Sequence, residues 1–197
     1  MLTEVKNQLK VSFLSVRYAL QREMLNKVTF ISNVFFMILN DASFIIQWII
    51  FYSLKDSVGG YTFSKVLLLW GLAAATFGFS RFFFKDAFKL SDTINSGKLD
   101  VYLIQPKNLL ISSITSSVEV SSIGDIIYGY IMLIFYGLSL RSFLLFTLFS
   151  FTGALIITSV SIIFSSLTFW FGRVEVAVET INSQMINFAT YPDGIFK

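Results

Sequence analysis

Long apolar runs, separated by short polar turns, set the pattern of this chain. The first run covers residues 28–54 and the second covers residues 61–84, with the polar turn 55–60 between them. As a helix the first run is about 40 Å long, which is enough to cross a hydrocarbon core of about 30 Å. Residues 28–84 are therefore predicted to form a first hairpin of two transmembrane helices.

The second half of the chain repeats this alternation less sharply. A third apolar run begins at a point within residues 111–123 and ends near Leu138, and a fourth covers residues 143–171. Together these runs predict a second hairpin over residues 111–171. Residues 172–197 are only moderately apolar, so they are predicted to form either a re-entrant helix or a weaker fifth span.

Residues 1–27 carry apolar side chains at steps of three and four, which is the spacing of one face of a helix. These side chains are Leu2, Val5, Leu9, Phe13, Val16, Leu20 and Met24. The pattern predicts an amphipathic helix that lies in the membrane interface. The alternative is a helix whose apolar stripe packs on the rest of the protein.

Residues 85–110, between the two hairpins, stay polar and amphipathic, and we call them the coupling segment. Lys98 and Asp100 are costly in hydrocarbon, so the segment must meet water. Leu99 and Leu103 fall on one side of a helix, which predicts a short amphipathic helix at the membrane surface. Such a helix suits a soluble partner, and the alternative is an ordinary surface connector.

Composition supports an all-α integral membrane protein with a single transmembrane domain over residues 1–197. Hydrophobic residues make up 55% of the chain, charged residues only 14%, and the mean hydropathy is +0.72. The chain has no Cys and no His, which removes most catalytic and metal-binding chemistries. The net charge of +3 without a dense basic cluster favours contact with anionic lipid over nucleic acid.

Basic residues are unevenly distributed between the predicted sides of the membrane. Of the 15 Lys and Arg residues, the side opposite the N-terminus carries only Lys55, Lys65, Arg141 and Lys197. Cytoplasmic loops are enriched in Lys and Arg, so the N-terminus and the coupling segment are predicted to be cytoplasmic. Residues 55–61 and 139–142 are predicted to be external.

Asp41 lies near the middle of the first run, with Asn40 and Gln47 close by. An ionised carboxylate at that depth costs roughly 2.5–3.5 kcal/mol on insertion scales, so Asp41 is expected to face protein or water. These polar residues either line a path through the membrane or make structural hydrogen bonds between helices. The other candidate acids, Asp125 and Glu119, are expected nearer the cytoplasmic face, which argues against a proton path.

The centre of the coupling segment resembles the signature of a known permease family. The pattern Ile-x-x-Gly-x-Leu-Asp-x-x-Leu-x-x-Pro, which we call the coupling motif, is formed by Ile94, Gly97, Leu99, Asp100, Leu103 and Pro106. It is similar to that of second-class ABC exporter permeases (the ABC-2 family) related to daunorubicin-type drug exporters. The N-terminal interface helix, the order of the spans and the Phe169–Trp170 and Tyr191–Pro192 pairs extend the resemblance over essentially the whole chain.

This resemblance implies a permease subunit of the bacterial inner (cytoplasmic) membrane that exports an amphipathic small molecule, a lipid-like compound or a peptide. The implied partners are the lipid bilayer, a second permease half and a separate cytoplasmic ABC ATPase. The residues expected to dock the ATPase are Gly97, Leu99, Asp100, Leu103 and Pro106. ATP and Mg would belong to that partner, because this chain has no Gly-x-x-x-x-Gly-Lys-Ser/Thr loop. The chain itself is expected to be no enzyme and to hold no cofactor.

Family members usually continue with another hydrophobic span after the Tyr-Pro pair, so the resemblance also implies that the sequence is either truncated before a final span or a degenerate copy. A small non-transporting membrane scaffold or immunity protein is the alternative function, and it would need no ATPase. A membrane-embedded enzyme is disfavoured, because no close pair of acids is expected at membrane depth. The substrate, the direction of transport and the choice between homodimer and heterodimer do not follow from the residues.

Overall fold

The structure is a computed structural model that describes residues 2–195, with side chains from residue 6 onward. Apart from an isolated β-bridge between Val58 and Tyr61, the regular elements of this part are helices. In chain order they are α1 Leu2–Glu23, α2 Lys27–Leu54, α3 Phe63–Phe84, η1 Lys85–Lys89, α4 Leu90–Asn95, α5 Asp100–Leu103, α6 Leu109–Ile114, α7 Ser122–Gly137, α8 Leu140–Ser166, α9 Thr168–Phe171, α10 Glu175–Thr190 and η2 Asp193–Ile195.

Three helical stretches are long and apolar enough to cross a membrane. They are Lys27–Leu54, Phe63–Asn95 and Leu140–Phe171, and the shorter apolar helix α7 accompanies them. The prediction of an all-α membrane protein is therefore confirmed. With 16 residues, α7 reaches only about 24 Å. It begins late because residues 115–121 are non-helical and bond to Arg81 of α3 and to Lys85 and Asp86 of η1 instead.

The centre of the fold is the contact between α3 and α7, which run antiparallel. Gly71 and Ala75 of α3 lie against Gly129 of α7, and a Cβ placed on Gly129 would lie 2.6 Å from the Gly71 carbonyl oxygen and 2.7 Å from the Ala75 Cβ. Small residues at such a contact let two helix backbones approach closely. Tyr128 and Leu133, on either side of it, are fully buried.

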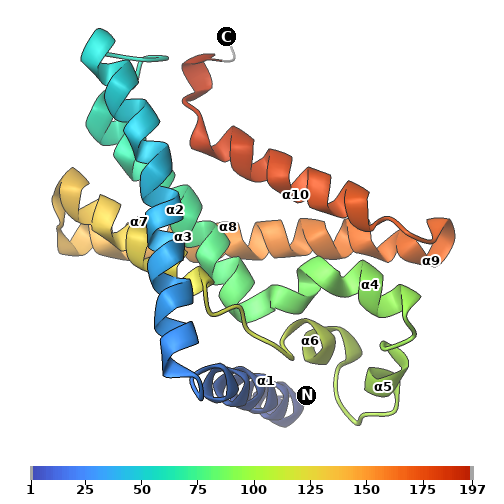
Figure 1. Ribbon diagram of the computed structural model, residues 1–197. Helices are drawn as coiled ribbons and strands as arrows, with labels where there is room; N and C mark the ends of the chain where they lie inside the picture. Colours follow the sequence, from blue (N-terminus) through green and yellow to red (C-terminus); the bar gives the residue numbers. More distant parts are fainter. Residues whose placement is uncertain (1, 196–197) are drawn as a thin grey trace.

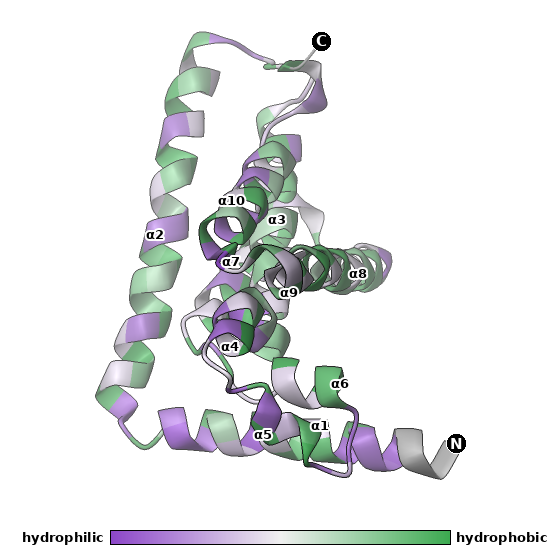
Figure 2. Ribbon diagram, turned by 90° about the vertical axis from the view of Figure 1, so that its right-hand side faces the viewer, coloured by the Kyte–Doolittle hydropathy of each residue, from purple (hydrophilic) through white to green (hydrophobic). Residues whose placement is uncertain are grey.

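The other long helices pack on this pair. α2 lies on α7, where Gly124 meets the backbone of Val34 and Ile45 packs on Tyr128. α8 crosses α3 (Figure 1), with Gly153 on Thr76. In both Figure 1 and Figure 2, α2 stands upright while α1 lies across its lower end and α8 is strongly inclined to it.

The two turns predicted to be external lie at different levels of the fold. The turn between α7 and α8 lies far below the turn between α2 and α3 in both views (Figures 1 and 2). The short α7 does not reach the level of the α2–α3 turn. The placement of residues 139–142 outside the membrane therefore stays a prediction.

α10 connects the two ends of the bundle. At its start, Asn95 Nδ2 donates to Glu175 Oε1 at 2.7 Å, and at its far end the Tyr191 ring lies 6.0 Å from the Trp48 ring. The chain then packs on the α2–α3 turn, where a Cβ on Gly59 would lie 3.1 Å from the Pro192 side chain. In the part of the chain that the structure describes, α10 is not among the helices long and apolar enough to cross a membrane, so the choice between a re-entrant helix and a weaker fifth span stays a prediction.

We predict that Gly129→Ala destabilises the protein by about 1–3 kcal/mol, because the added methyl group would force α3 and α7 apart. The matched control is Gly153→Ala, whose Cβ would meet only the side chain of Thr76. Unfolding of both variants in mixed micelles by a denaturing detergent measures the difference. Equal stability of Gly129→Ala and the wild type would show that the α3–α7 contact is loose.

Candidate functional site

The coupling motif consists of short pieces rather than one amphipathic helix. α4 ends at Asn95, the backbone turns at Gly97 with φ +71°, and α5 is a single turn that begins at Asp100. The positive φ suits glycine because other residues are strained there. Pro106 lies beyond the end of α5. The predicted short helix is present as the single turn of α5, and it begins after Gly97 because a right-handed helix cannot pass through that conformation.

The apolar side chains of the motif project outward. Val101 is 58% exposed, Leu103 63% and Ile104 86%. We call these three residues the apolar tip. Leu99, by contrast, is half-buried. Of the two leucines predicted to contact the ATPase, Leu103 is exposed and Leu99 is half-buried. The apolar tip also includes Val101, which the sequence analysis did not select.

α1 is fixed to the end of the coupling segment by a buried glutamine. Gln8 Nε2 donates to Ser112 Oγ at 3.2 Å, and Gln8 Oε1 accepts from the backbone N–H of Asn108 at 3.0 Å. Asn108 in turn caps α6 by accepting from the Ile111 N–H at 3.1 Å. The sequence analysis did not identify Gln8, because a single glutamine on an amphipathic helix reads as a solvated position.

The apolar stripe of α1 is divided between protein and open surface. Ala19 and Leu20 pack on Val118, in the segment that leads to α7. Leu9 and Phe13, earlier along the same stripe, are 63% and 68% exposed. Both alternatives for this helix therefore hold in part, because the later part of the stripe packs on protein and its earlier part is exposed.

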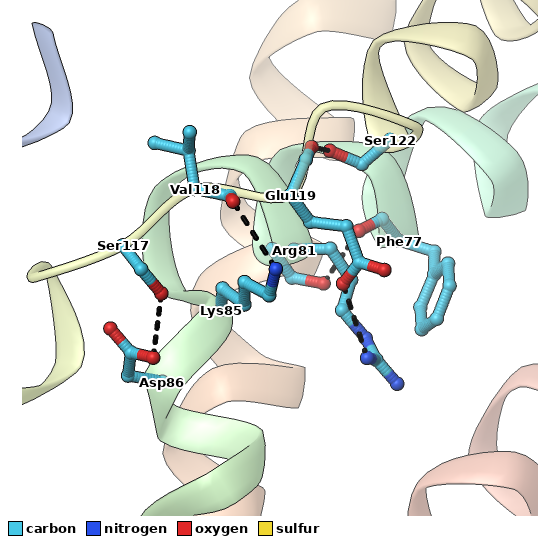
Figure 3. A network of polar contacts seen from close by, with 9 residues as sticks. Phe77, Arg81, Lys85, Asp86, Ser117, Val118, Glu119 and Ser122 are labelled. Atoms are coloured by element: carbon cyan, nitrogen blue, oxygen red, sulfur yellow. Dashed lines mark hydrogen bonds and ion pairs between the residues drawn. The ribbon is translucent and has the colours of Figure 1, made fainter. Parts of the chain in front are cut away.

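Polar bonds join the lower end of α3 to the segment that leads into α7 (Figure 3). Asp86 of η1 accepts from Ser116 Oγ at 2.6 Å and from Ser117 Oγ at 2.7 Å. Lys85 Nζ donates to the Val118 carbonyl oxygen at 3.3 Å. Two neighbouring hydroxyl groups of this segment thus share one carboxylate as their acceptor.

Arg81 lies on α3 one turn before Lys85 and adds an ion pair to these polar bonds. Its Nη1 lies 3.4 Å from Glu119 Oε2, and its guanidinium carbon lies 4.9 Å and 4.5 Å from the ring centroids of Phe77 and Phe88. Ser122 donates to the Glu119 carbonyl oxygen at the start of α7. Two aromatic rings and one carboxylate therefore hold the arginine at the edge of the apolar region.

These contacts form one continuous connection. The coupling segment leads through α6 into residues 115–121, which bond to α3 and η1 and then become α7. A displacement of the coupling motif would therefore reach α3 and α7 together. None of the residues of this network had been selected as a site, since each pair is far apart in sequence.

The polar residues selected on α2 do not form one surface. Asn40 and Gln47 are exposed, while Asp41 is half-buried and lies within hydrogen-bonding reach of Asp125 on α7. The expectation that Asp125 lies apart from Asp41, nearer one face of the membrane, is wrong. α7 starts partway along α2, with Gly124 opposite Val34, Met37 and Ile38, so the residue that follows Gly124 lies within reach of the next turn of α2, which carries Asp41.

Comparison with protein families now places the chain. The sequence pattern of the ABC-2 family transporter proteins matches residues 28–197. The chain belongs to the ABC-2 family. It is therefore a multi-pass membrane protein and the transport subunit of an ABC transporter, not itself catalytic. Permeases of this family generally work with a cytoplasmic ABC ATPase. No curated protein and no solved structure matches the chain.

We predict that Asp86→Ala destabilises this ABC-2 permease by about 1–3 kcal/mol, because the hydroxyl groups of Ser116 and Ser117 lose their shared acceptor. Asp92→Ala is the matched control, since Asp92 is exposed on α4. Thermal unfolding of the purified variants in detergent gives the comparison. We call the bonds of Asp86 to Ser116 and Ser117, with those of Lys85 and Arg81 beside them, the Asp86 network. Equal losses of stability in the two variants would mean that this network contributes nothing specific.

Proposed function

We propose that this chain is the transmembrane subunit of an ATP-driven exporter in the bacterial cytoplasmic membrane, with its N-terminus and coupling segment in the cytoplasm. The observation that carries the proposal is the apolar tip. It lies exposed on the polar segment between the two helical hairpins, within a chain that belongs to a family of transport subunits.

The apolar tip is suited to a groove on the ATPase. Leu103 and Ile104 are exposed apolar side chains whose burial in a groove would favour binding, and Lys98, Asp100 and Gln105 around them are exposed. Gly97 sets the direction in which the tip projects. Leu99, Asp100 and Pro106 frame the same turn. ATP and Mg would bind to the ATPase.

Movement of the tip would reach the membrane through the Asp86 network and Gln8. Since residues 115–121 bond to α3 and continue into α7, a push on the coupling segment moves the closely packed α3–α7 pair as a unit. α8 and α10 pack on α3 and would follow. This is a rigid-body transition of the kind that alternates access to a transport path.

The exposed amides of α2 suit a path formed with a second permease half. Asn33, Asn40 and Gln47 recur at intervals of seven residues, and all three are exposed. Figure 2 shows hydrophilic bands along α2. Amides facing lipid lack hydrogen-bond partners, whereas across a shared path they meet water, substrate or the other half. Isolated amides among apolar side chains suit an amphipathic substrate better than an ion.

The alternative, a small non-transporting scaffold or immunity protein, requires no nucleotide-binding partner. Affinity purification of the tagged chain from its native membranes separates the two functions. Recovery of an ABC ATPase supports the exporter, and its reproducible absence from an intact, membrane-inserted chain overturns it.

We predict that Leu103→Ser combined with Ile104→Ser weakens binding to the co-purified ATPase at least tenfold, or by about 1.4 kcal/mol. Both side chains are largely exposed, so the variant is expected to fold and insert normally. Met24→Ser with Leu25→Ser is the control, since these side chains are also exposed, at 47% and 84%. A pull-down titration measures the affinity, and wild-type affinity of the tip variant would contradict the docking role.

We further predict that a single cysteine at Ser57 reacts with an impermeant reagent from outside the cell, whereas one at Lys98 reacts only after the membrane is opened. The natural chain contains no cysteine, so each label reports one position. The expectation rests on the unequal distribution of basic residues. Labelling of the Ser57 cysteine only from inside would reverse the orientation.

A further inference from the structure

Asp41 and Asp125 face each other across the contact between α2 and α7. Their carboxyl groups lie within hydrogen-bonding reach. The surrounding packing gives the same register, since Gly124 meets Val34 and Ile45 meets Tyr128. Both helices are apolar, and neither acid is used by the Asp86 network. The pair therefore needs an explanation of its own.

Two buried oxygen atoms at this contact have no hydrogen-bond partner. Asp41 Oδ2 is buried and accepts no hydrogen bond, and the hydroxyl group of Tyr128, a residue only 1% exposed, has no partner either. Tyr128 interacts electrostatically with Asp41, and it packs on Ile45 in the same contact between α2 and α7. A fully buried phenol beside two carboxyl groups indicates a site for something that supplies hydrogen bonds or positive charge.

The charged neighbours do not neutralise the pair. From α3, Arg81 interacts with Asp125 but is already paired with Glu119 at 3.4 Å. Glu119, in the segment before α7, adds negative charge. The charged and titratable groups that face the pair are thus Arg81, Glu119 and Tyr128. Within residues 2–195 no third acid completes a metal site.

Two carboxylates in contact repel each other strongly when water is scarce, and a hydrogen bond between them requires a proton on one of them. Such pairs bind one proton jointly. A proton fits this site better than a metal ion, because no third acid joins the two within the described residues.

We propose that Asp41 and Asp125 form a proton-binding site that joins α2 to α7, and that release of the shared proton separates the two helices. Ile45 and Trp48 are the buried residues of α2, and the side chains along the rest of this helix are half-buried or exposed. The site gives the position of α2 a dependence on pH. It requires no ATPase and therefore stands apart from the proposed function.

The first test is infrared spectroscopy of the purified full chain in phosphatidylglycerol nanodiscs at neutral pH, where exposed carboxyl groups are ionised. We expect the carbonyl stretch of a protonated carboxylic acid in the wild type and its loss in Asp41→Asn/Asp125→Asn. Asp86→Asn, which alters an acid outside the pair, retains the band. Absence of the band from the wild type, or its persistence in the double variant, overturns the proposal.

The second test measures the separation of the helices. Spin labels on cysteines placed at Leu54 and Leu138, which are 78% and 61% exposed, report the distance between the ends of α2 and α7. We expect this distance to increase when the pH is raised from neutral to strongly alkaline. In Asp41→Asn/Asp125→Asn it stays constant, because two amides hydrogen-bond without a titrating proton. An unchanged distance in the wild type contradicts the proposal.

Discussion

The close approach of α3 and α7 is the contact on which the rest of the structure depends. Gly71 and Gly129 bring the two backbones together, and α2, α8 and α10 then pack on one or the other of these helices. In a bilayer, where apolar side chains gain little by leaving lipid, such close packing replaces the hydrophobic effect as the main source of helix association. A loss of this contact would release every other long helix.

The charged residues are placed where this pair leaves the apolar region. Arg81 lies in the last turn of α3 and Asp86 lies in η1, which follows it directly. Both bond to the segment that becomes α7. The close-packed pair and the polar network therefore act on the same two helices, one within the apolar region and one at its edge. This combination allows a rigid unit to be moved from outside the membrane.

Local patterns were sufficient to predict the helices, because each apolar run carries its own signal of length and period. The turn at Gly97 was also predictable, since glycine is the residue that adopts a positive φ without strain. The pairing of Asp41 with Asp125 was not, because the register between two apolar helices depends on which small residues allow contact. Gln8 and Asp86 were missed for the same reason, as their partners are distant in the sequence.

The short length of α7 has a consequence for the surrounding bilayer. Ile134, Phe135 and Leu138, near its end, are exposed, yet a helix of 16 residues covers only about 24 Å of a hydrocarbon core of about 30 Å. Lipids beside this end must shorten their span, since mismatch is relieved by local thinning. A thinned patch next to α7 would shorten the distance over which the polar part of an amphipathic molecule has to travel.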